Sequence, residues 1–363
     1  MNETIDLSGI DSPSIILIRE IMERNIEVAL DMVPLDRFRP HVKTNKTSEI
    51  CKILIEKGVN KFKTSTIAET EMIAMLGGKD VLLAHQLTSV KMDRFIKLKF
   101  EYPKTFFSCI FDDFDNLAHF NELLKYHDIK QDVFIDVNVG MNRTGVNCNE
   151  LIELYQQSLG LDNINIRGFH IYDGHIRESN VEQREVIVKD TFQLAYSKIE
   201  QIENSISKKF EIVAGGSPSF SVHAQNKRVE CSPGTFIFWD WKYSRFFPDL
   251  KFECAVYIIT RVISVLDGKR ICLDVGHKAV SAENPFPRLK FLHLEEVKSL
   301  LQSEEHLVIE IEDTSKIKVG DVFLAIPDHI CPTVALHECM HVIENNKYVF
   351  DWQIVARKRK INL

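Results

Sequence analysis

Short apolar runs alternate with longer segments of helical periodicity between Asp36 and about Thr235, and this alternation limits the fold more than any other feature of the sequence. β-Branched and aromatic residues dominate the short runs, as in parallel strands joined by crossover helices. There are eight such runs: residues 38–43, 61–64, 81–83, 105–110, 132–137, 164–171, 212–214 and 229–232. Eight strand-and-helix units predict an α/β fold of the (β/α)8 TIM barrel type.

Helices are expected between these strands. The clearest are residues 48–58, 67–77, 113–126 and 181–206. The second follows Thr66, with Glu69 three residues later, and this pair is typical of a capped first turn.

After Pro248 the pattern changes to strands without long helices between them. The expected strands are residues 255–265, 271–275, 307–312, 322–326 and 348–357. Residues 13–18 precede the first barrel helix and could add a strand to the same unit. We therefore predict a barrel domain at residues 19–245 and a C-terminal β domain that also includes the start of the chain, as residues 1–18 plus 246–363.

Charge and hydropathy argue against several classes of protein. The 52 acidic residues outnumber the 45 basic ones, and a net charge of -7 is unlike that of a nucleic-acid binder. No apolar stretch reaches the 18 or so residues of a membrane span, and acidic Glu3 and Asp6 occupy the place of a basic secretory n-region. The eight cysteines are scattered singly without a C-x-x-C pair, as in a reducing compartment. We expect a cytoplasmic protein with mostly buried thiols.

Two loops at predicted strand ends could bind phosphate. In TIM barrels the active site lies at the carboxyl ends of the strands, and phosphate often binds the loops after strands seven and eight. Here the seventh strand is followed by Gly215, Gly216 and Ser217, and the eighth by Gly234 and Thr235. Glycines let backbone amides approach an anion, and hydroxyls add donors. Either loop alone would more often be an ordinary turn, but together they predict a site for a phosphorylated cofactor or substrate.

Four more polar side chains stand where predicted strands end. Lys43 ends the first strand, where an apolar or cationic setting could make its amine nucleophilic. Arg143 follows the fifth strand, and alternation along the sixth sends His170 and Tyr172 to one side. The plainer interpretations are a solvated lysine and a histidine satisfied inside the barrel.

The run from His337 to His341 spells H-E-x-x-H, which can bind zinc when both histidines lie on one face of a helix. β-Branched residues flank the motif, however, and Asn345-Asn346 indicates a hairpin turn shortly after it. Residues four apart in a strand are separated by about 13 Å. We therefore expect no shared metal at these two histidines.

A second pair, His329 and Cys331, could share an ion because residues two apart in an extended segment point to one side. Imidazole and thiolate suit zinc, and two protein ligands would leave positions for water or a substrate hydroxyl. A buried thiol beside a loop histidine is the alternative on spacing alone.

Six ordered elements carry a family resemblance: RPHVKTNK, VNVGMNRTG, GFHIYDGH, AGGSPS, SPGTF and IPDHICPT. Together they resemble the alanine racemase superfamily of fold-type III pyridoxal phosphate enzymes, and within it the D-threonine aldolase and D-serine dehydratase group. The resemblance covers nearly the whole chain.

The resemblance implies roles for individual residues. Lys43, rather than its neighbour Lys46, matches the lysine that forms the internal Schiff base with pyridoxal phosphate. Arg143 matches the arginine facing the cofactor's phenolic oxygen. His170 and Tyr172 are expected to be catalytic, with Tyr172 also in contact with the cofactor.

Further positions match the family's phosphate cradle and metal pair. The cradle matches Gly215, Gly216, Ser217, Gly234 and Thr235. His329 and Cys331 match a His-x-Cys pair that binds a divalent ion, which implies zinc, with manganese or magnesium as alternatives. Asn45 occupies the position at which the family commonly has a histidine, in the sequence RPHVKTHK. A contact made by that histidine in other members is therefore not expected in this chain.

The expected function is that of a pyridoxal phosphate- and metal-dependent lyase, with a D-amino acid as substrate and a homodimer as the assembly. Retro-aldol cleavage of a β-hydroxy D-amino acid would give glycine and an aldehyde. Dehydration in the manner of D-serine dehydratases is an alternative. An amino-acid racemase and a pyridoxal phosphate-binding protein without turnover are others.

Overall fold

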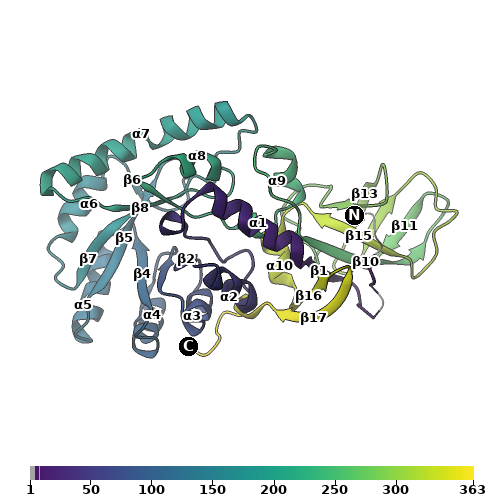
Figure 1. Ribbon diagram of the computed structural model, residues 1–363, viewed down its shortest axis with the longest axis horizontal. Helices are drawn as coiled ribbons and strands as arrows, with labels where there is room; N and C mark the ends of the chain where they lie inside the picture. Colours follow the sequence, from purple (N-terminus) through teal and green to yellow (C-terminus); the bar gives the residue numbers. More distant parts are fainter. Residues whose placement is uncertain (1–4, 8) are drawn as a thin grey trace. The chain divides into compact units, whose positions relative to one another are not determined.

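The computed structural model describes residues 5–7 and 9–363, and the chain divides into two compact units (Figure 1). The barrel unit comprises residues 29–43, 50–234 and 358–363. The β unit comprises residues 1–28, 44–49 and 235–357. Whether residues 19–245 fold as an independent domain stays a prediction.

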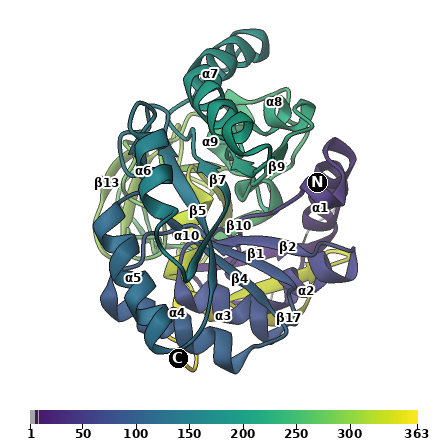
Figure 2. The same ribbon diagram turned by 90° about the vertical axis from the view of Figure 1, so that its left-hand side faces the viewer.

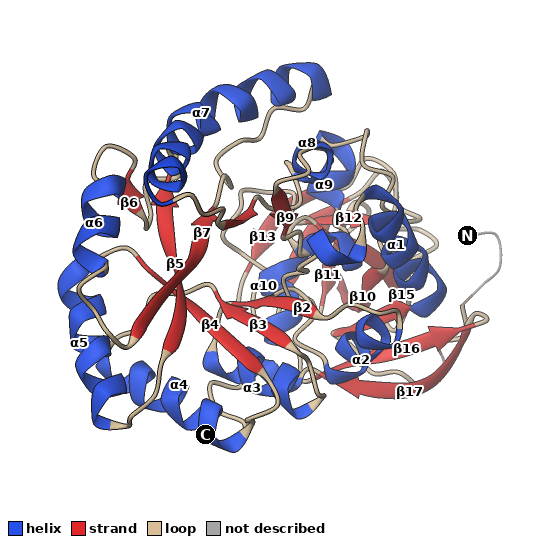
Figure 3. Ribbon diagram, turned by 60° about the vertical axis from the view of Figure 1, so that its left-hand side comes forward, coloured by secondary structure: helices blue, strands red, loops and turns tan. Residues whose placement is uncertain are grey.

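A curved parallel sheet forms the barrel unit, as the sequence predicts. Its strands in spatial order are β2 (Lys61–Thr64), β3 (Asp80–Leu83), β4 (Phe106–Phe111), β5 (Gln131–Asn138), β7 (Ile164–Ile171), β8 (Glu211–Ala214) and β9 (Val229–Cys231), all paired in parallel. The short β6 (Val146–Asn147) pairs with β5. Figures 2 and 3 show helices along the outer side of this sheet.

The first predicted strand, residues 38–43, is not a regular strand. It makes single bridges from Phe38 to Cys231 in β9 and from His41 to Lys63 in β2. Pro40 lies between the two bridges; it has no N–H to donate, and a ladder cannot run through it. Residues 38–42, here the closing segment, nevertheless join both edges of the sheet, with the Val42 amide 3.0 Å from the Lys63 carbonyl. The sheet closes through this segment, and the TIM-like barrel is confirmed.

The helices of the chain include the four predicted from the sequence. The described helices are α1 (Arg19–Met32), α2 (Ser48–Glu56), α3 (Ile67–Met75), α4 (Ser89–Glu101), α5 (Phe114–Tyr126), α6 (Leu151–Ser158), α7 (Val181–Ile206), α8 (Phe220–Gln225), α9 (Trp241–Phe246) and α10 (Ile330–Leu336). The four predicted ones are observed as α2, α3, α5 and α7. The Thr66 hydroxyl caps α3 by accepting the Glu69 amide at 3.1 Å. Within the described residues, no helix is both long and apolar enough to cross a membrane.

The barrel interior is apolar in its middle. Leu82, Ile110, Phe134 and Val213 come from β3, β4, β5 and β8, pack together, and are almost completely buried. Burial of such side chains stabilises each by roughly 1.5–3 kcal/mol, and it leaves the polar residues at the strand ends to carry chemistry.

A buried ionic network fixes the closing segment. The fully buried Arg39 guanidinium donates to Asp80 at 2.7 Å and to Glu230 at 2.7 Å. Arg167 donates to Asp80 at 2.5 Å and to Glu211 at 2.9 Å. These bonds tie the segment to β3 and β9, and Lys43 follows directly after it.

A mostly antiparallel sheet organises the β unit. Its strands are β1 (Ser14–Ile18), β10 (Val256–Val265), β11 (Arg270–Leu273), β12 (Leu289–Phe291), β13 (Lys298–Gln302), β14 (Leu307–Glu310), β15 (Val322–Pro327), β16 (Cys339–Glu344) and β17 (Lys347–Gln353). Among these described strands, only β1 and β16 pair in parallel. Spatially they follow the order β13, β14, β11, β10, β1, β16, β17, with β15 joining β10 to β12. The expected contribution of residues 13–18 is confirmed, because β1 pairs with β10 and β16.

Two stretches of the β unit differ from the sequence prediction. The strand expected at 348–357 stops at Gln353, and a 3-10 turn occupies residues 355–357. Residues 330–336, expected to be extended, form α10. In the described chain no two cysteines form a disulfide, and five of the eight thiols are buried, as expected.

Candidate active site

Tyr172 forms the centre of the candidate site in the barrel unit. It follows the last residue of β7, at the carboxyl end of the strand. The Lys43 Nζ lies 5.6 Å from the centroid of its ring, and the Arg143 Cζ lies 5.0 Å from the same centroid. The structure thus brings three predicted site residues together, with two cations near one aromatic ring.

The loop that presents Arg143 is shaped by the last residue of β5. The Asn138 side-chain oxygen accepts the Gly140 amide at 2.9 Å and the Asn142 amide at 3.1 Å. Asn142 has a positive φ of 52°, which asparagine tolerates better than most residues. This turn explains why the MNRTG sequence places a cation beside Tyr172.

Lys63 is a functional candidate that the sequence reasoning missed. It lies in β2, is only 2% exposed, and its Nζ is 5.8 Å from the Tyr172 ring centroid. The Nζ donates to the Ser232 hydroxyl at 2.5 Å. Burial, aided by the positive charge of Lys43, lowers the pKa of Lys63 to about 7. Its position one residue before the carboxyl end of a barrel strand was the available signal.

His170 belongs to a buried relay rather than standing alone. Its Nδ1 lies 2.7 Å from the Asp136 carboxylate and its Nε2 3.2 Å from the Lys63 amine. Burial and the charge of Lys63 lower the pKa of His170, which favours the neutral ring. An Nδ1–H bonded to Asp136 leaves the Nε2 lone pair for Lys63. His170 therefore orients Lys63, and its predicted catalytic role stays a prediction.

The loop after β8 depends on its glycines. Gly215 has a φ of +77°, and a Cβ on it would lie 2.4 Å from the His223 ring. A Cβ on Gly216 would lie 3.2 Å from the Tyr172 ring. The Gly216 amide makes only a long bond to Ser219, at 3.4 Å, and the Gly234 amide donates to Ser217 at 3.2 Å. Amides held this loosely by hydroxyls suit an incoming phosphate.

A buried triad beneath this loop was also missed from sequence. Asp173 accepts from the Ser219 hydroxyl at 2.9 Å and contacts the His223 Nε2 at 2.8 Å. Burial alone would raise the pKa of Asp173, but the charge and hydrogen bond of His223 keep this pKa below its ordinary value. Through Ser219 and His223, the triad ties the loop after β8 and the start of α8 to Asp173.

The barrel-unit residues fit pyridoxal phosphate. A lysine amine, a guanidinium and loosely bonded amides are present, the Gly215 position leaves no room for a side chain, and a Cβ at Gly216 would be tightly packed. Thr235 begins a 3-10 turn (Thr235–Ile237) of the β unit instead. Its contribution to phosphate binding stays a prediction.

The candidate metal pair lies at the start of α10. His329 is the N-cap and Cys331 lies in the first turn, so the extended geometry expected from sequence is wrong. The Cys331 sulfur lies 3.1 Å from the Thr44 hydroxyl and 3.4 Å from that of Thr235.

The surroundings of His329 suit a metal ligand. Its Nδ1 lies 2.5 Å from the Glu283 carboxylate, an arrangement that orients many metal-bound histidines. Burial alone would lower the pKa of His329, but hydrogen bonds to Cys331 and Glu283 raise it to about 9. The buried Asp240 caps α9, accepts the Ile330 amide at 3.3 Å, and has a pKa raised by burial to about 7. Sequence reasoning missed both carboxylates.

The H-E-x-x-H motif does not lie on a helix. Helix α10 ends at Leu336, directly before His337, and β16 starts at Cys339. The His337 Nε2 lies 2.8 Å from the Ala279 carbonyl, whereas His341 lies within β16, in the part of the strand that pairs with β17. The residues just before the motif, expected to be extended, are helical instead.

Comparison with known proteins finds a family match for each of two parts of the chain. Residues 19–239 match the alanine racemase N-terminal domain, and residues 255–343 match a "Putative serine dehydratase domain". A 3-hydroxy-D-aspartate aldolase of Paracoccus denitrificans (strain Pd 1222) is 26% identical over 375 residues, which cover 97% of this chain and 94% of the relative. A D-serine dehydratase of Dictyostelium discoideum is 22% identical, with 97% and 98% covered.

A solved structure agrees in fold over the same length. The crystal structure of D-threonine aldolase from Filomicrobium marinum matches with a TM-score of 0.85 and 23% identity, and 97% of each chain is covered. The resemblance seen in the six sequence elements is therefore confirmed. The chain belongs to the alanine racemase superfamily of fold-type III pyridoxal phosphate enzymes.

Proposed function

We propose that the protein is a pyridoxal phosphate- and metal-dependent lyase that cleaves β-hydroxy D-amino acids into glycine and an aldehyde. The observation that supports this most is the grouping of Lys43 and Arg143 around the Tyr172 ring. Related proteins named as aldolases and as a dehydratase act on substrates of this class. A cytoplasmic location, a homodimer and zinc as the metal are parts of the same proposal.

Each group has a distinct task in this proposal. Lys43 would hold the cofactor, Arg143 would balance the phenolic oxygen, and the Gly216 and Gly234 amides would bind the phosphate. When bound, pyridoxal phosphate supplies an electron sink for the bond that breaks at Cα. His329 and Cys331 would hold the divalent ion, whose chemistry is to lower the pKa of the β-hydroxyl.

Dehydration to a 2-oxo acid and ammonia is the second candidate. Cys331 favours it, since the His-x-Cys pair resembles the dehydratase branch, whereas the GFHIYDGH element resembles the aldolase branch. Retro-aldol cleavage needs the β-hydroxyl to be deprotonated. Dehydration instead needs this oxygen to leave and a base to take the α-proton. Lys43 is suited to be that base.

A substrate panel tests the proposal. The protein is incubated with D-threonine, D-serine, 3-hydroxy-D-aspartate and D-alanine, each with its L enantiomer as control, and the products are identified. Glycine with an aldehyde or 2-oxo acid partner supports retro-aldol cleavage. If the only products are pyruvate and ammonia from D-serine, the reaction is dehydration and not retro-aldol cleavage. Interconversion of D- and L-alanine would identify a racemase, whose reaction does not need the metal.

Replacing Gly216 with valine is expected to weaken pyridoxal phosphate binding by about 10-fold or more, or ~1.4 kcal/mol. The new side chain would start 3.2 Å from the Tyr172 ring, a contact so tight that the ring or the loop must shift. Absorbance titration with the cofactor measures the affinity. Gly268→Val is the matched control, because a Cβ at Gly268 meets no atom within 4 Å. Unchanged affinity of Gly216→Val would move the phosphate site elsewhere.

Removal of metal with a chelator is expected to lower turnover by about 100-fold or more, and added zinc should restore it. Cys331→Ala should stay inactive with zinc because it lacks the thiolate ligand. Cys254→Ala, which removes another half-buried thiol of the β unit, should recover fully. Steady-state rates of the dialysed variants give the comparison, and zinc recovery by Cys331→Ala would refute the assignment.

Lys63 should make the stability of the cofactor-free protein depend on pH. Its folded pKa of about 7 lies below the ordinary ~10.4, so the unfolded chain binds more protons between these values. The free energy of unfolding should therefore rise with pH across this window, by up to roughly 1 kcal/mol per pH unit. Urea unfolding at several pH values should show this rise in the wild type and its loss in Lys63→Met.

A further inference from the structure

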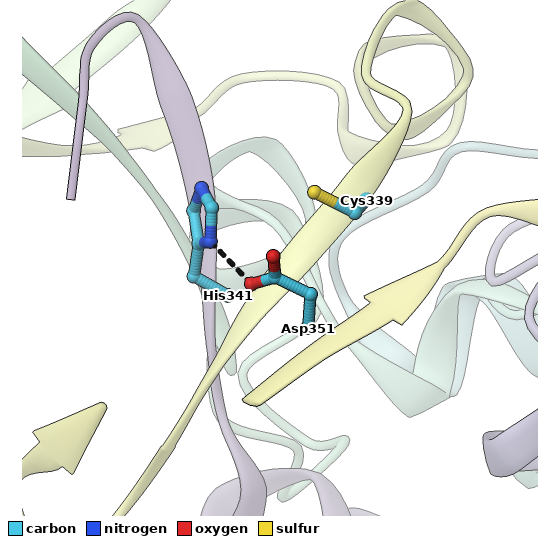
Figure 4. Close-up of side chains that lie close together, drawn as sticks. All are labelled: Cys339, His341 and Asp351. Carbon is cyan, nitrogen blue, oxygen red and sulfur yellow. Dashed lines mark hydrogen bonds and ion pairs between the residues drawn. The ribbon is translucent and has the colours of Figure 1, made fainter. Parts of the chain in front are cut away.

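Three potential metal ligands meet on the hairpin formed by β16 and β17. Cys339 and His341 are two residues apart on β16, and Asp351 on β17 is the register partner of His341. One ligand atom from each, a sulfur, a ring nitrogen and a carboxylate oxygen, lies within 4.8 Å of the others. Figure 4 shows the three side chains gathered beside these strands, with the His341 Nδ1 2.6 Å from the Asp351 Oδ1.

We propose that Cys339, His341 and Asp351 bind one zinc ion, at a site different from the His329 and Cys331 pair. Zinc bonds of 2.0–2.3 Å place two ligands of a tetrahedral ion roughly 3.3–3.8 Å apart. Small side-chain rotations would therefore bring the three atoms into this geometry. The hydrogen bond between His341 and Asp351 accounts for the positions of these two side chains without an ion. It does not account for the Cys339 thiol, which points to the same place.

A hollow lies next to two of the three proposed ligands, His341 and Asp351. This hollow of about 300 Å³ is lined by His341, Tyr348, Asp351 and residues 9–14. The side chains of His341 and Asp351 are 19% and 36% exposed, so solvent ions reach them. Three protein ligands leave the fourth position to a water molecule from this hollow.

The donor set selects the class of ion. Magnesium and calcium prefer oxygen ligands alone, whereas a thiolate with imidazole and one carboxylate favours zinc. Binding would release the Cys339 thiol proton to solvent and leave a thiolate ligand, while a neutral His341 imidazole would keep its one proton on the ring nitrogen that does not bind the ion. The ion would join β16 to β17 and stabilise the hairpin.

Cobalt titration of a variant lacking the first pair tests the proposal without using enzyme activity. In the His329→Ala, Cys331→Ala background, one equivalent of Co²⁺ per chain should produce thiolate-to-cobalt absorption in the near ultraviolet. Adding Cys339→Ser should abolish this absorption, and adding Asp351→Asn should weaken cobalt binding by about 10-fold or more. Absence of the band in the parent background overturns the proposal.

Two control variants separate the site from nearby alternatives. His337→Gln alters the other histidine of the H-E-x-x-H sequence, and Cys254→Ser removes another half-buried thiol. Both should keep the cobalt band. Loss of the band in His337→Gln, or its persistence in Cys339→Ser, would contradict the proposed ligand set.

Zinc content of the full-length protein provides a second measurement that does not depend on the doubly substituted background. After dialysis against zinc, elemental analysis should find two ions per wild-type chain and one per chain in either His341→Gln or His329→Ala. A single ion in the wild type that survives His341→Gln would overturn the proposal.

Discussion

Replacing Lys43 with alanine is expected to lower turnover by about 1000-fold or more while the protein remains folded. The variant loses the amine that holds the cofactor, and Lys43 is not part of the apolar core. Steady-state rates with the best substrate of the panel measure the loss, and circular dichroism checks the fold.

Two arginine variants serve as controls for this prediction. Lys43→Arg keeps a positive charge beside Tyr172 but cannot form a Schiff base, so it should be as inactive as the alanine variant. Lys46→Arg changes the neighbouring lysine and should retain turnover within a few-fold. An active Lys43→Arg protein would show that Lys43 supplies only charge.

Replacing Asp80 with asparagine is expected to lower the free energy of unfolding by about 3–5 kcal/mol. Asp80 accepts hydrogen bonds from both Arg39 and Arg167, and the substitution leaves these buried guanidinium groups without sufficient negative charge. Urea unfolding measures the change. Because Arg39 lies in the closing segment, the loss should also loosen the chain just before Lys43.

Glu304→Gln is the control, since it breaks an exposed pair with Lys278 and should leave the free energy of unfolding nearly unchanged. Acid unfolding gives a second check. Burial opposes the Asp80 carboxylate, but the two arginines hold its pKa at about 2. Its stabilisation is complete above about pH 4 and is lost as the pH falls towards 2, and this loss should be missing in Asp80→Asn. Equal stability of Asp80→Asn and Glu304→Gln would contradict the network's role.

The barrel strands could be predicted because their signal is local. In residues 164–171, INIRGFHI, apolar residues alternate with polar or small ones, and the structure places β7 at the same positions. Residues 38–43 show the limit of this signal. They lie between β9 and β2, as a first barrel strand should, but Pro40 interrupts the ladder of hydrogen bonds, so they do not form a regular strand. Helix α10 has too few residues, and too many β-branched ones, for helical periodicity to stand out.

The parts of the site that were missed depend on contacts between distant strands. Lys63 resembles any strand lysine until the barrel brings it to His170 and Ser232. Asp173 and His223 are 50 residues apart and have no shared motif. By contrast, Lys43 and Arg143 could be predicted because both belong to ordered elements that resemble a family.

Borohydride reduction of the cofactor-loaded protein, followed by peptide mass analysis, tests the central claim most directly. The reduction converts a Schiff base into a stable bond and thus marks the lysine that holds pyridoxal phosphate. We predict the pyridoxyl group on Lys43. Its presence on Lys46 or on the buried Lys63, or its absence from every lysine, would contradict the account.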